Sequence, residues 1–598
     1  MTDLVGDVIL ARLREWGVRQ VFGYPGDGIN GLLAAWVRAR NDPEFVQARH
    51  EEMAAFEAVG YAKFSDGLGV CTATSGPGAI HLLNGLYDAK LDHVPVVAIV
   101  GQAERTSLGG SYQQEVDLLT TFKDVCSAYV QMCVVPQQLP NLLDRAIRVA
   151  LAERTPTAVI VPADVFDLEY EPPEHTFRHV PSSLGMSTGR TLPDRNSLTR
   201  AADILNSGEK VAMLVGQGAR GCAVELTELA GLLGAGVAKA LLGKDVLPDT
   251  EPWVTGAIGL LGTTASYHMM READTLLTIG SNFPYTQFLP DFDQVRAIQI
   301  DRSGTWIGMR YPYELNIVGD AKTTLRELIP LLRYKRERTW REEIEEHTRS
   351  WWRTAERYAM TPADPINPMR IVHELSEQLP GNAIITADSG TAADWYARHL
   401  RFRSRMRGSL SGTLATMGSA VPYAIGAKWA HPDRPAIALV GDGAMQMNGL
   451  AELITVARYR QHWEDPRLVV AVLHNNDLNQ VTWEMRGMEG SPKFAASQTL
   501  PDVDYAAFAR GLGLGAANVD DPDEVAGAWE RALADDRPWV LDFRCDPDVP
   551  PIPPHTTFEQ VTATAKAMLR GDENAAGVLR HSVKQKVRQH LPGGSSAD

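Results

Sequence analysis

The stretch Ile437-Ala-Leu-Val-Gly-Asp-Gly-Ala-Met-Gln446 decides the fold, because an apolar run of strand length ends abruptly in Gly441-Asp442-Gly443. A second run, Val469-Val-Ala-Val-Leu-His-Asn-Asn-Asp477, ends at Asn475-Asn476. The carboxyl ends of parallel strands share one sheet edge, where α/β proteins bind ligands. Glycines there let the backbone approach a phosphate. Asp442, the Asn476 amide oxygen and the Leu478 carbonyl are oxygen ligands of the kind that Mg²⁺ prefers. Together the two runs predict a magnesium and diphosphate site, whereas a lone Gly-Asp-Gly indicates only a tight turn.

Short β-branched runs alternate with helical patterns along the chain, which predicts an α/β protein with doubly wound parallel sheets. Its 598 residues exceed what one hydrophobic core supports. We predict three domains, at 1–172, 190–335 and 365–548, and a tail at 549–598, with the first and third as candidates for one fold used twice. A proline-rich linker at Tyr170–Pro181 and a charged helix from Tyr334 to about Arg357 separate the domains. The predicted strands are Gln20–Gly23, Gly69–Ala73, Val94–Val100, Ala158–Val161, Val211–Val215, Thr275–Ile279, Ala297–Ile300, Ala383–Thr386, Ala436–Val440, Leu468–Leu473 and Trp539–Phe543.

Charge and cysteine content exclude several classes of protein. The formal net charge is 58 − 74 = −16, which argues against a nucleic-acid partner. The five cysteines are scattered and form no CxxC pair, a pattern typical of reduced cytosolic thiols. The N-terminus shows no signal-peptide pattern, and apolar runs such as Val94–Val100 are too short to span a bilayer. We therefore expect a cytoplasmic protein.

The middle domain carries a glycine-rich turn, Gly216-Gln-Gly-Ala-Arg-Gly221, directly after a predicted strand. The GxGxxG pattern is typical of dinucleotide sites. An NAD site also needs an acidic residue after the next strand, and the segment Ala238–Gly243 has none. Binding of NAD is therefore disfavoured, and close packing of helix on sheet is the alternative explanation of the glycines.

The combination of Gly441-Asp442-Gly443 and Asn475-Asn476 resembles the magnesium-diphosphate signature of thiamine-diphosphate (ThDP) enzymes, although the separation of 475 − 443 = 32 residues is longer than is usual there. Arg49-His50-Glu51-Glu52 resembles the family's Arg-His-Glu motif. The resemblance implies that Glu51 is the catalytic carboxylate against the aminopyrimidine ring of the cofactor, with Glu52 as the alternative. Both acids also suit a helix N-terminus, where the helix dipole favours negative charge.

Further segments resemble the family's cofactor contacts. Ser75-Gly-Pro-Gly78, with Pro77, is similar to the turn over the pyrimidine, and Leu414-Ala-Thr-Met-Gly418 to the segment that props the cofactor. The resemblance implies that Met417 is the wedge and that the Ala415 carbonyl accepts from the exocyclic amine, although a methionine is also a common core filler. The other cofactor contacts implied are Asn84, Gly441, Gly443, Ala444 and Met445.

The middle domain resembles the FAD domain of the pyruvate oxidase and pyruvate:quinone dehydrogenase group, and more loosely that of acetohydroxyacid synthase. The resemblance implies a Rossmann-like FAD-type domain between two ThDP-binding domains. The flavin contacts that it implies are Gly218, Ala219, Arg220, Asn282 and Asp301. Some relatives keep this domain without FAD, so FAD is an expectation that needs its own test.

The expected substrate site draws on two segments. In Tyr112-Gln-Gln-Glu115, Gln114 matches a catalytic position of the pyruvate oxidase group, while Gln113 replaces the usual aromatic residue. In Val481-Thr-Trp-Glu-Met485, Glu484 is the catalytic candidate, and one residue is deleted relative to the group's pattern. Trp483 is either a wall of the substrate site or a helix-packing residue.

The resemblance implies oxidative decarboxylation of a small 2-oxo acid, most simply pyruvate, with electrons passing through FAD to quinone or dioxygen. It also implies a homodimer as the minimal active unit, and a homotetramer as the expected assembly. The alternatives are a non-oxidative ThDP lyase or carboligase and a non-catalytic ThDP-binding scaffold. In the tail, Val578, Leu579, Val583, Val587 and Leu591 recur mostly at four-residue spacing among basic residues. This pattern predicts a helix that lies on the inner face of the membrane or packs on its own subunit.

Overall fold

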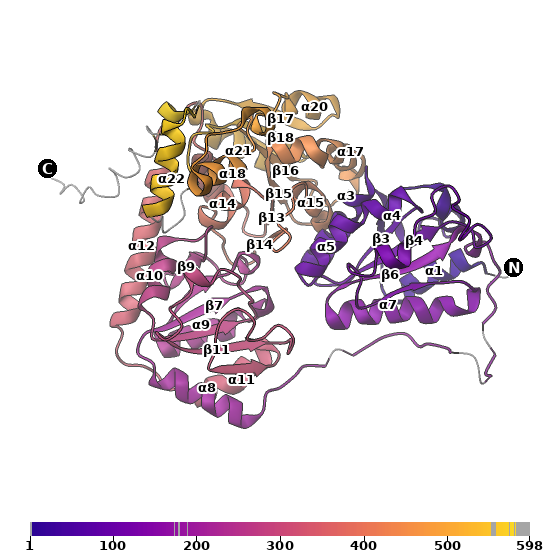
Figure 1. The fold of residues 1–598 in the computed structure, drawn as a ribbon, viewed down its shortest axis with the longest axis horizontal. Coiled ribbons are helices and arrows are strands. Elements are labelled where there is room, and N and C mark those ends of the chain that lie inside the picture. The colour runs from indigo at the N-terminus through magenta and orange to yellow at the C-terminus, as the bar shows by residue number, and fades with distance from the viewer. Residues whose placement is uncertain are drawn as a thin grey trace.

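The computed structural model describes residues 3–172, 174–176, 180–187, 189–551, 558–572, 574–578 and 581. Three separate six-stranded sheets, all parallel and covered by helices, make up the chain. This confirms the predicted fold class. Figure 1 shows the N-terminal sheet in indigo and violet, the central sheet in magenta below the C-terminal sheet in orange, and the linker after residue 170 running to the central domain. Among the described residues, no helix is long and apolar enough to cross a membrane.

The N-terminal sheet has the strand order β2-β1-β3-β4-β6-β5. Its strands are β1 (Gln20–Gly23), β2 (Glu44–Gln47), β3 (Gly69–Ala73), β4 (Val96–Gln102), β5 (Val130–Met132) and β6 (Pro156–Pro162). Its helices are α1 (Val5–Glu15), α2 (Asn30–Arg38), α3 (Glu51–Ser65), α4 (Pro77–His81), α5 (Leu83–Leu91), α6 (Leu118–Thr121) and α7 (Leu139–Glu153).

The C-terminal sheet has the order β14-β13-β15-β16-β18-β17. Its strands are β13 (Ile384–Ala387), β14 (Arg407–Leu410), β15 (Ala436–Gly441), β16 (Leu468–His474), β17 (Gly515–Val519) and β18 (Trp539–Arg544). Its helices are α13 (Pro368–Gln378), α14 (Thr391–Arg398), α15 (Ala420–Ala430), α16 (Asp442–Ala444), α17 (Leu450–Tyr459), α18 (Asn479–Glu484), α19 (Ala495–Gln498), α20 (Tyr505–Gly511), α21 (Val525–Ala534) and α22 (Phe558–Leu569). Counted from its first strand, this order repeats that of the N-terminal sheet, so one fold is used twice.

The central sheet has the order β12-β11-β10-β7-β8-β9, the arrangement of dinucleotide-binding folds. Its strands are β7 (Val211–Val215), β8 (Gly236–Lys239), β9 (Val254–Ala257), β10 (Thr275–Ile279), β11 (Arg296–Asp301) and β12 (Leu315–Val318). Its helices are α8 (Arg195–Ser207), α9 (Ala223–Leu233), α10 (Thr264–Glu272) and α11 (Ala321–Leu328), and α12 (Thr339–Ala359) connects it to the C-terminal domain.

Helix α3 of the first sheet packs closely on α15 of the third, and this contact joins the two domains that carry the predicted site residues. A Cβ at Gly60 would lie 2.7 Å from the Tyr423 Cα, and one at Gly426 would lie 2.3 Å from the Glu57 carbonyl oxygen. Only glycine lets the two backbones approach this closely. Buried side chains from both domains consequently form one continuous hydrophobic core.

Candidate functional site

Asp442 lies at the carboxyl edge of the C-terminal sheet, at the first position of α16, and is almost fully buried. Its Oδ2 accepts hydrogen bonds from the backbone amides of Asn475, at 3.0 Å, and Asn476, at 2.6 Å. Strands β15 and β16 are neighbours, so their ends bring the two sequence motifs together as predicted. Burial raises the pKa of Asp442 to about 6 despite these amide bonds. A desolvated carboxylate of this kind fits a divalent cation, which would offset the cost of burying its charge.

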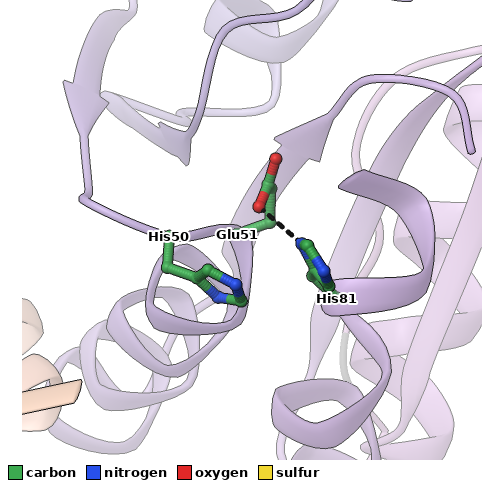
Figure 2. A group of neighbouring side chains, drawn as sticks. All are labelled: His50, Glu51 and His81. Carbon is green, nitrogen blue, oxygen red and sulfur yellow. Dashed lines mark hydrogen bonds and ion pairs between the residues drawn. The ribbon is translucent and has the colours of Figure 1, made fainter. Parts of the chain in front are cut away.

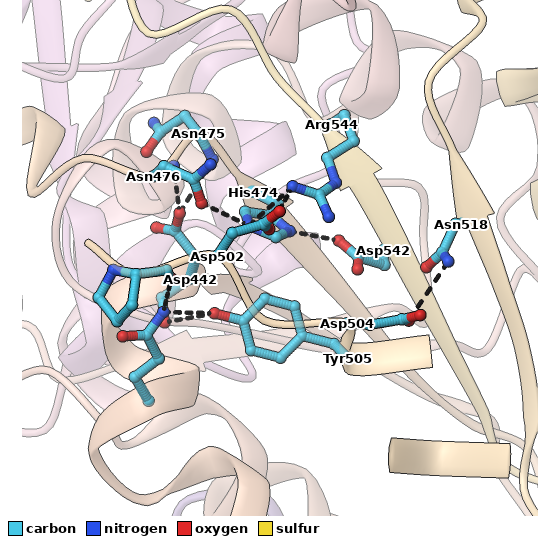
Figure 3. A network of polar contacts seen from close by, with 12 residues as sticks. Asp442, His474, Asn475, Asn476, Asp502, Asp504, Tyr505, Asn518, Asp542 and Arg544 are labelled. Carbon is cyan, nitrogen blue, oxygen red and sulfur yellow. Dashed lines mark hydrogen bonds and ion pairs between the residues drawn. The ribbon is translucent and has the colours of Figure 1, made fainter. Parts of the chain in front are cut away.

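Two hydrogen bonds in series hold the Asn476 side chain: His474 contacts Asn476, and Asp542 contacts His474, as Figure 3 shows. His474 Nε2 lies 2.6 Å from Asn476 Oδ1, and His474 Nδ1 lies 2.8 Å from Asp542 Oδ1 on β18. Burial alone would lower the pKa of His474, but its hydrogen bond to Asp542 and the charge of that carboxylate raise it instead. Asn476 itself has a φ of 54°, so its backbone is held in the left-handed region. This support fixes the position of the amide predicted to bind the metal.

We predict that Asp542→Asn lowers the apparent affinity for Mg²⁺ about 10- to 100-fold, because partners that orient a metal ligand have effects of that size. A Mg²⁺ titration at saturating ThDP, followed by tryptophan fluorescence, measures this. The control is Asp520→Asn, an exposed carboxylate that follows β17 of the same sheet. Equal Mg²⁺ affinities of wild type and Asp542→Asn would show that the Asp542–His474 contact does not orient Asn476.

The backbone around Asp442 is shaped to admit a ligand on one side. A Cβ on Gly441 would meet no atom within 4 Å, whereas one on Gly443 would lie 2.7 Å from Leu478 Cδ2 and 3.2 Å from Met417 Cε. Ala444 and Met445 follow as buried residues of the helix start. The Leu478 carbonyl accepts from the Thr482 amide at 3.2 Å, which leaves one of its two lone pairs for an ion. The predicted wedge Met417 thus lies beside the Gly441-Asp442-Gly443 turn.

The segment that carries Met417 is held by Asp388, a residue the sequence patterns did not single out. Asp388 Oδ1 accepts from the amides of Gly418, at 2.8 Å, and Ser419, at 3.1 Å. Ala415, with a φ of 55°, and Gly418, with a φ of 88°, turn the chain on either side of Met417. Asp388 follows β13 and is buried, with no hydrogen-bond partner for Oδ2 in the described residues. Burial therefore raises its pKa to about 7.

We predict that Asp388→Asn becomes increasingly stabilising, relative to wild type, as the pH rises from about 4 to about 7, and that the difference then levels off. The folded protein holds this proton up to pH 7 whereas the unfolded chain releases it near 3.8, so the ionised carboxylate costs stability across that window. The full difference corresponds to at most about 4 kcal/mol. Thermal melting of wild type and variant at several pH values measures it, with the exposed Asp536→Asn as control. A melting-temperature difference that stays constant with pH would contradict this prediction.

Glu51 is the first residue of α3 and is only 8 % exposed. Its Oε2 lies 2.9 Å from His81 Nδ1, and the ring centroids of His50 and His81 are 4.3 Å apart. Figure 2 shows these three side chains next to one another. Its Oε1 approaches Gly78 closely, because a Cβ there would lie 3.1 Å from it. His81, at the end of α4, was not predicted as a site residue; its position four residues after Pro77 in the Ser75-Gly-Pro-Gly78 helix start was the available signal.

Glu52 connects the two ThDP-type domains. Its Oε1 accepts from Asn84 Nδ2 at 2.6 Å, and its Oε2 accepts from Asn448 Nδ2 at 3.0 Å. Asn84, a predicted cofactor contact, also donates to Thr416 Oγ1 at 3.1 Å. Glu52 and Asn84 are therefore engaged in a polar contact between domains, next to the segment that carries Met417.

The predicted substrate residues lie in two different surroundings. Gln114, with a φ of 63°, accepts from Ser75 Oγ at 3.1 Å and so rests on the turn that precedes Pro77. Glu484 ends α18, is exposed and accepts from Gln480 Nε2 at 3.1 Å. Its neighbour Trp483 packs against Val578 and other residues of the C-terminal segment. This contact supports the interpretation of Trp483 as a helix-packing residue.

Part of the predicted tail helix lies within the described residues. Val578 is buried, and His581 Nε2 lies 2.9 Å from Asp546 Oδ2. These two residues pack on their own chain rather than facing outward. The remaining positions of the predicted amphipathic pattern, Leu579, Val583, Val587 and Leu591, lie outside the described residues.

The glycine-rich turn of the central domain packs against a second glycine. A Cβ on Gly218 would lie 2.8 Å from the Gly280 Cα, so close packing accounts for this glycine. Ala219 is buried beside it. The Arg220 guanidinium is already paired, with Nε 2.9 Å from Asp245 Oδ1 and Nη2 3.0 Å from the Leu242 carbonyl. A flavin contact through this guanidinium would have to replace those bonds.

Two of the predicted flavin residues have side-chain oxygens that could accept hydrogen bonds from a ligand. Asn282 Oδ1 is buried and has no hydrogen-bond partner in the described part of the chain. Asp301, at the end of β11, accepts from the Ser303 amide at 2.9 Å, and burial raises its pKa. A ligand with hydrogen-bond donors would satisfy Asn282, so this side of the central sheet edge fits FAD while Arg220 does not contribute to that fit.

A desolvated carboxylate, an oriented amide and an open glycine at one sheet edge fit the class of protein that holds a diphosphate through a divalent cation. Three family descriptions identify which class. Residues 4–121 match the thiamine pyrophosphate enzyme N-terminal TPP binding domain, residues 198–328 the central domain, and residues 388–543 the C-terminal TPP binding domain. The chain belongs to the thiamine pyrophosphate (ThDP) enzyme family.

Relatives cover nearly the whole chain. YdaP of Bacillus subtilis (strain 168), described as thiamine pyrophosphate-containing, is 35% identical over 94% of this chain and 95% of its own. Acetolactate synthase 1 of Nicotiana tabacum is 30% identical over 90% and 81%, respectively. The pyruvate oxidase of Lactiplantibacillus plantarum is 26% identical over 90% and 88%. These relatives support membership of the family. The names of the synthase and the oxidase give two different reactions.

Proposed function

We propose that this enzyme oxidatively decarboxylates a small 2-oxo acid, most simply pyruvate, with ThDP, Mg²⁺ and FAD, and passes the electrons to quinone or dioxygen. The observation that carries the decarboxylation is the pair of Asp442 bonds to the Asn475 and Asn476 amides, beside an open Gly441. ThDP, when bound, supplies an electron sink that makes the loss of CO₂ from a 2-oxo acid feasible. Asp442, Asn476 and Leu478 would hold its Mg²⁺.

Glu51 is the residue we assign to proton handling. Its burial and its contact with His81 hold the carboxylate in one orientation at the start of α3. A carboxylate positioned in this way stabilises a protonated ring nitrogen and thereby promotes proton transfer. Asp388 holds the turn at Gly418, and this turn keeps Met417 against Gly443. The surface that would receive the cofactor is therefore formed before the cofactor binds.

The oxidative step rests on the central domain. The unpaired Asn282 Oδ1 and the strand order of the central sheet support a bound dinucleotide. FAD, when bound, accepts two electrons. We expect purified protein to be yellow, with flavin absorption that bleaches when pyruvate is added without oxygen and returns with dioxygen or a quinone. A colourless protein that releases CO₂ from pyruvate would overturn the oxidative assignment and leave the decarboxylation intact.

A carboligase that forms acetolactate is the second candidate. The identity of 30% to the tobacco acetolactate synthase, against 26% to the pyruvate oxidase, favours it. Incubation with pyruvate alone separates the two reactions. Acetolactate accumulates in an acceptor-free reaction of a carboligase, whereas an oxidase reduces one equivalent of acceptor for each CO₂ released.

We propose further that the active unit contains two copies of the chain, as the smallest part of a tetramer, with Glu51 of one copy serving the Asp442 edge of the other. Elements that bear site residues expose large apolar side chains, among them Ile80, Met447 and Val481, which favours a protein contact there. Co-expression of Glu51→Gln and Asp442→Ala chains tests this. Random mixing gives one intact site in each mixed dimer, so about a quarter of wild-type activity should return. If each copy supplies both residues, no activity returns.

A further inference from the structure

A pocket of about 560 Å³ lies outside the ThDP and central-domain sites, where the connecting helix α12 meets α13 and the end of α14. Its residues come from three separate segments: Arg349, Trp352 and Arg353 on α12, His373 on α13, and His399 and Arg401 after α14. The mechanism proposed above uses none of these residues. Pockets of 300 to roughly 1,000 Å³ are typical of small-molecule sites.

Arg401 is the first indication of a ligand. Its guanidinium stacks over the Trp352 ring, 4.6 Å from the ring centroid. Its Nε is buried and has no hydrogen-bond partner among the described residues. No carboxylate in the described ranges forms an ion pair with it, in contrast to its neighbour on the same chain segment, Arg407, which pairs with Asp245 at 3.1 Å. Buried side-chain N–H groups are mostly paired in folded proteins, so the Arg401 Nε can still donate to an acceptor on a ligand.

His399 is the second and independent indication. It lines the pocket and is only 4 % exposed. Its ring contacts Trp395 and Trp351, with centroids 5.7 and 6.1 Å apart, and its nitrogens form no hydrogen bond within the described part of the chain. Burial, together with the charge of Arg398, lowers the pKa of His399 well below its ordinary value. The neutral ring therefore offers one N–H donor and one acceptor to the pocket.

Among the lining residues, His399 is buried and Arg401 is half-buried, whereas the acids are not. The two acidic residues of the lining, Glu356 and Glu377, are both exposed. Arg349 and Arg353 contact Glu346 at 3.0 and 2.9 Å, in pairs that are more than half exposed. Exposed ion pairs are weak, so both arginines can turn to a stronger acceptor. Guanidinium groups bind phosphate oxygens in pairs of parallel hydrogen bonds.

We propose that this pocket binds a phosphorylated small molecule of nucleotide size. Arg401 and Arg353 would contact its phosphate oxygens, while His399 would hydrogen-bond to the remainder of the ligand against the indole of Trp352. The volume exceeds what inorganic phosphate needs, and the aromatic lining suits a planar group. The pocket lies at the C-terminal end of α14. The first residue of this helix, Thr391, lies three positions after Asp388, which is next to the predicted cofactor site.

Isothermal titration calorimetry with ADP, AMP and inorganic phosphate tests the proposal. The protein is used with saturating ThDP, Mg²⁺ and FAD, so that the probes cannot occupy those sites. We expect one ADP per chain, bound more tightly than inorganic phosphate. Arg401→Gln should weaken ADP binding about 10-fold or more, because a charge-assisted bidentate contact is lost.

The exposed Arg353→Gln serves as a second variant in case Arg401→Gln does not fold, and it should also weaken ADP binding. Arg357→Gln is the matched control: it removes the same charge from an exposed position of α12 that does not line the pocket. The proposal is overturned if ADP and AMP do not bind, if inorganic phosphate binds as tightly as ADP, or if Arg353→Gln and Arg357→Gln have equal effects.

Discussion

Glu51→Gln is expected to lower the rate of pyruvate decarboxylation by a factor of about 10² to 10⁴, the range typical for loss of a positioned acid or base. Glutamine has nearly the same shape and keeps an oxygen for the contact with His81, which lies 2.9 Å from Glu51 Oε2. It cannot carry the negative charge that stabilises a protonated ring nitrogen. We therefore expect ThDP binding to stay within a few-fold of wild type while turnover is lost. Steady-state CO₂ release and a ThDP titration measure the two quantities separately.

Two further variants show whether the effect belongs to this carboxylate. Glu153→Gln removes an exposed carboxylate at the end of α7 in the same domain and should leave the rate unchanged. Glu51→Asp keeps the charge but shortens the side chain, so a partial loss is expected. Undiminished turnover of Glu51→Gln would remove Glu51 from the mechanism and direct attention to Glu52.

Asp442→Ala is expected to abolish Mg²⁺-dependent binding of ThDP, with a loss of at least about 100-fold in affinity, since even partners that only support a metal ligand contribute 10- to 100-fold. The substitution also frees the amides of Asn475 and Asn476, which donate to Asp442 Oδ2 at 3.0 and 2.6 Å. The turn that carries the second half of the site then loses its anchor. Quenching of tryptophan fluorescence by ThDP, at fixed Mg²⁺, measures the affinity.

The comparison for this variant is Asp520→Ala, which removes an exposed carboxylate after β17 at the carboxyl edge of the same sheet. It should bind ThDP as wild type does. Circular dichroism and melting of both variants separate loss of the site from loss of the fold. If folded Asp442→Ala still bound ThDP with Mg²⁺ at wild-type affinity, the metal would have to lie elsewhere.

The central strands of all three sheets were predictable because they are continuous buried apolar runs. β1, β3, β7 and β10 have the bounds that were predicted, whereas the edge strands were missed, namely β2, β5, β9, β12, β14 and β17. β5 has no buried residue and β12 alternates between buried and exposed positions, so neither stands out from a loop. The predicted helix near Tyr334–Arg357 begins later, at Thr339, and ends at Ala359.

The segment that separates the two motifs along the chain lies away from the predicted metal site. The segment after α17, with a short helical turn at Arg460–His462, precedes β16 and so lies at its amino end. Asp442 and Asn476 lie at the carboxyl end. Additional length there does not disturb the metal site.

The Gly441-Asp442-Gly443 and Asn475-Asn476 motifs determined by themselves that two strand ends would meet at one ligand-binding edge. Parallel strands place their carboxyl ends at the same edge, and consecutive strands are usually neighbours. The same was true of the α/β class and of the three-sheet organisation. Only the tertiary structure decided what surrounds these motifs. The contacts of Glu51 with His81, of Glu52 with Asn448 and of Arg220 with Asp245 join segments that are separate in the chain. Such contacts depend on how whole helices and domains pack, which no local periodicity encodes.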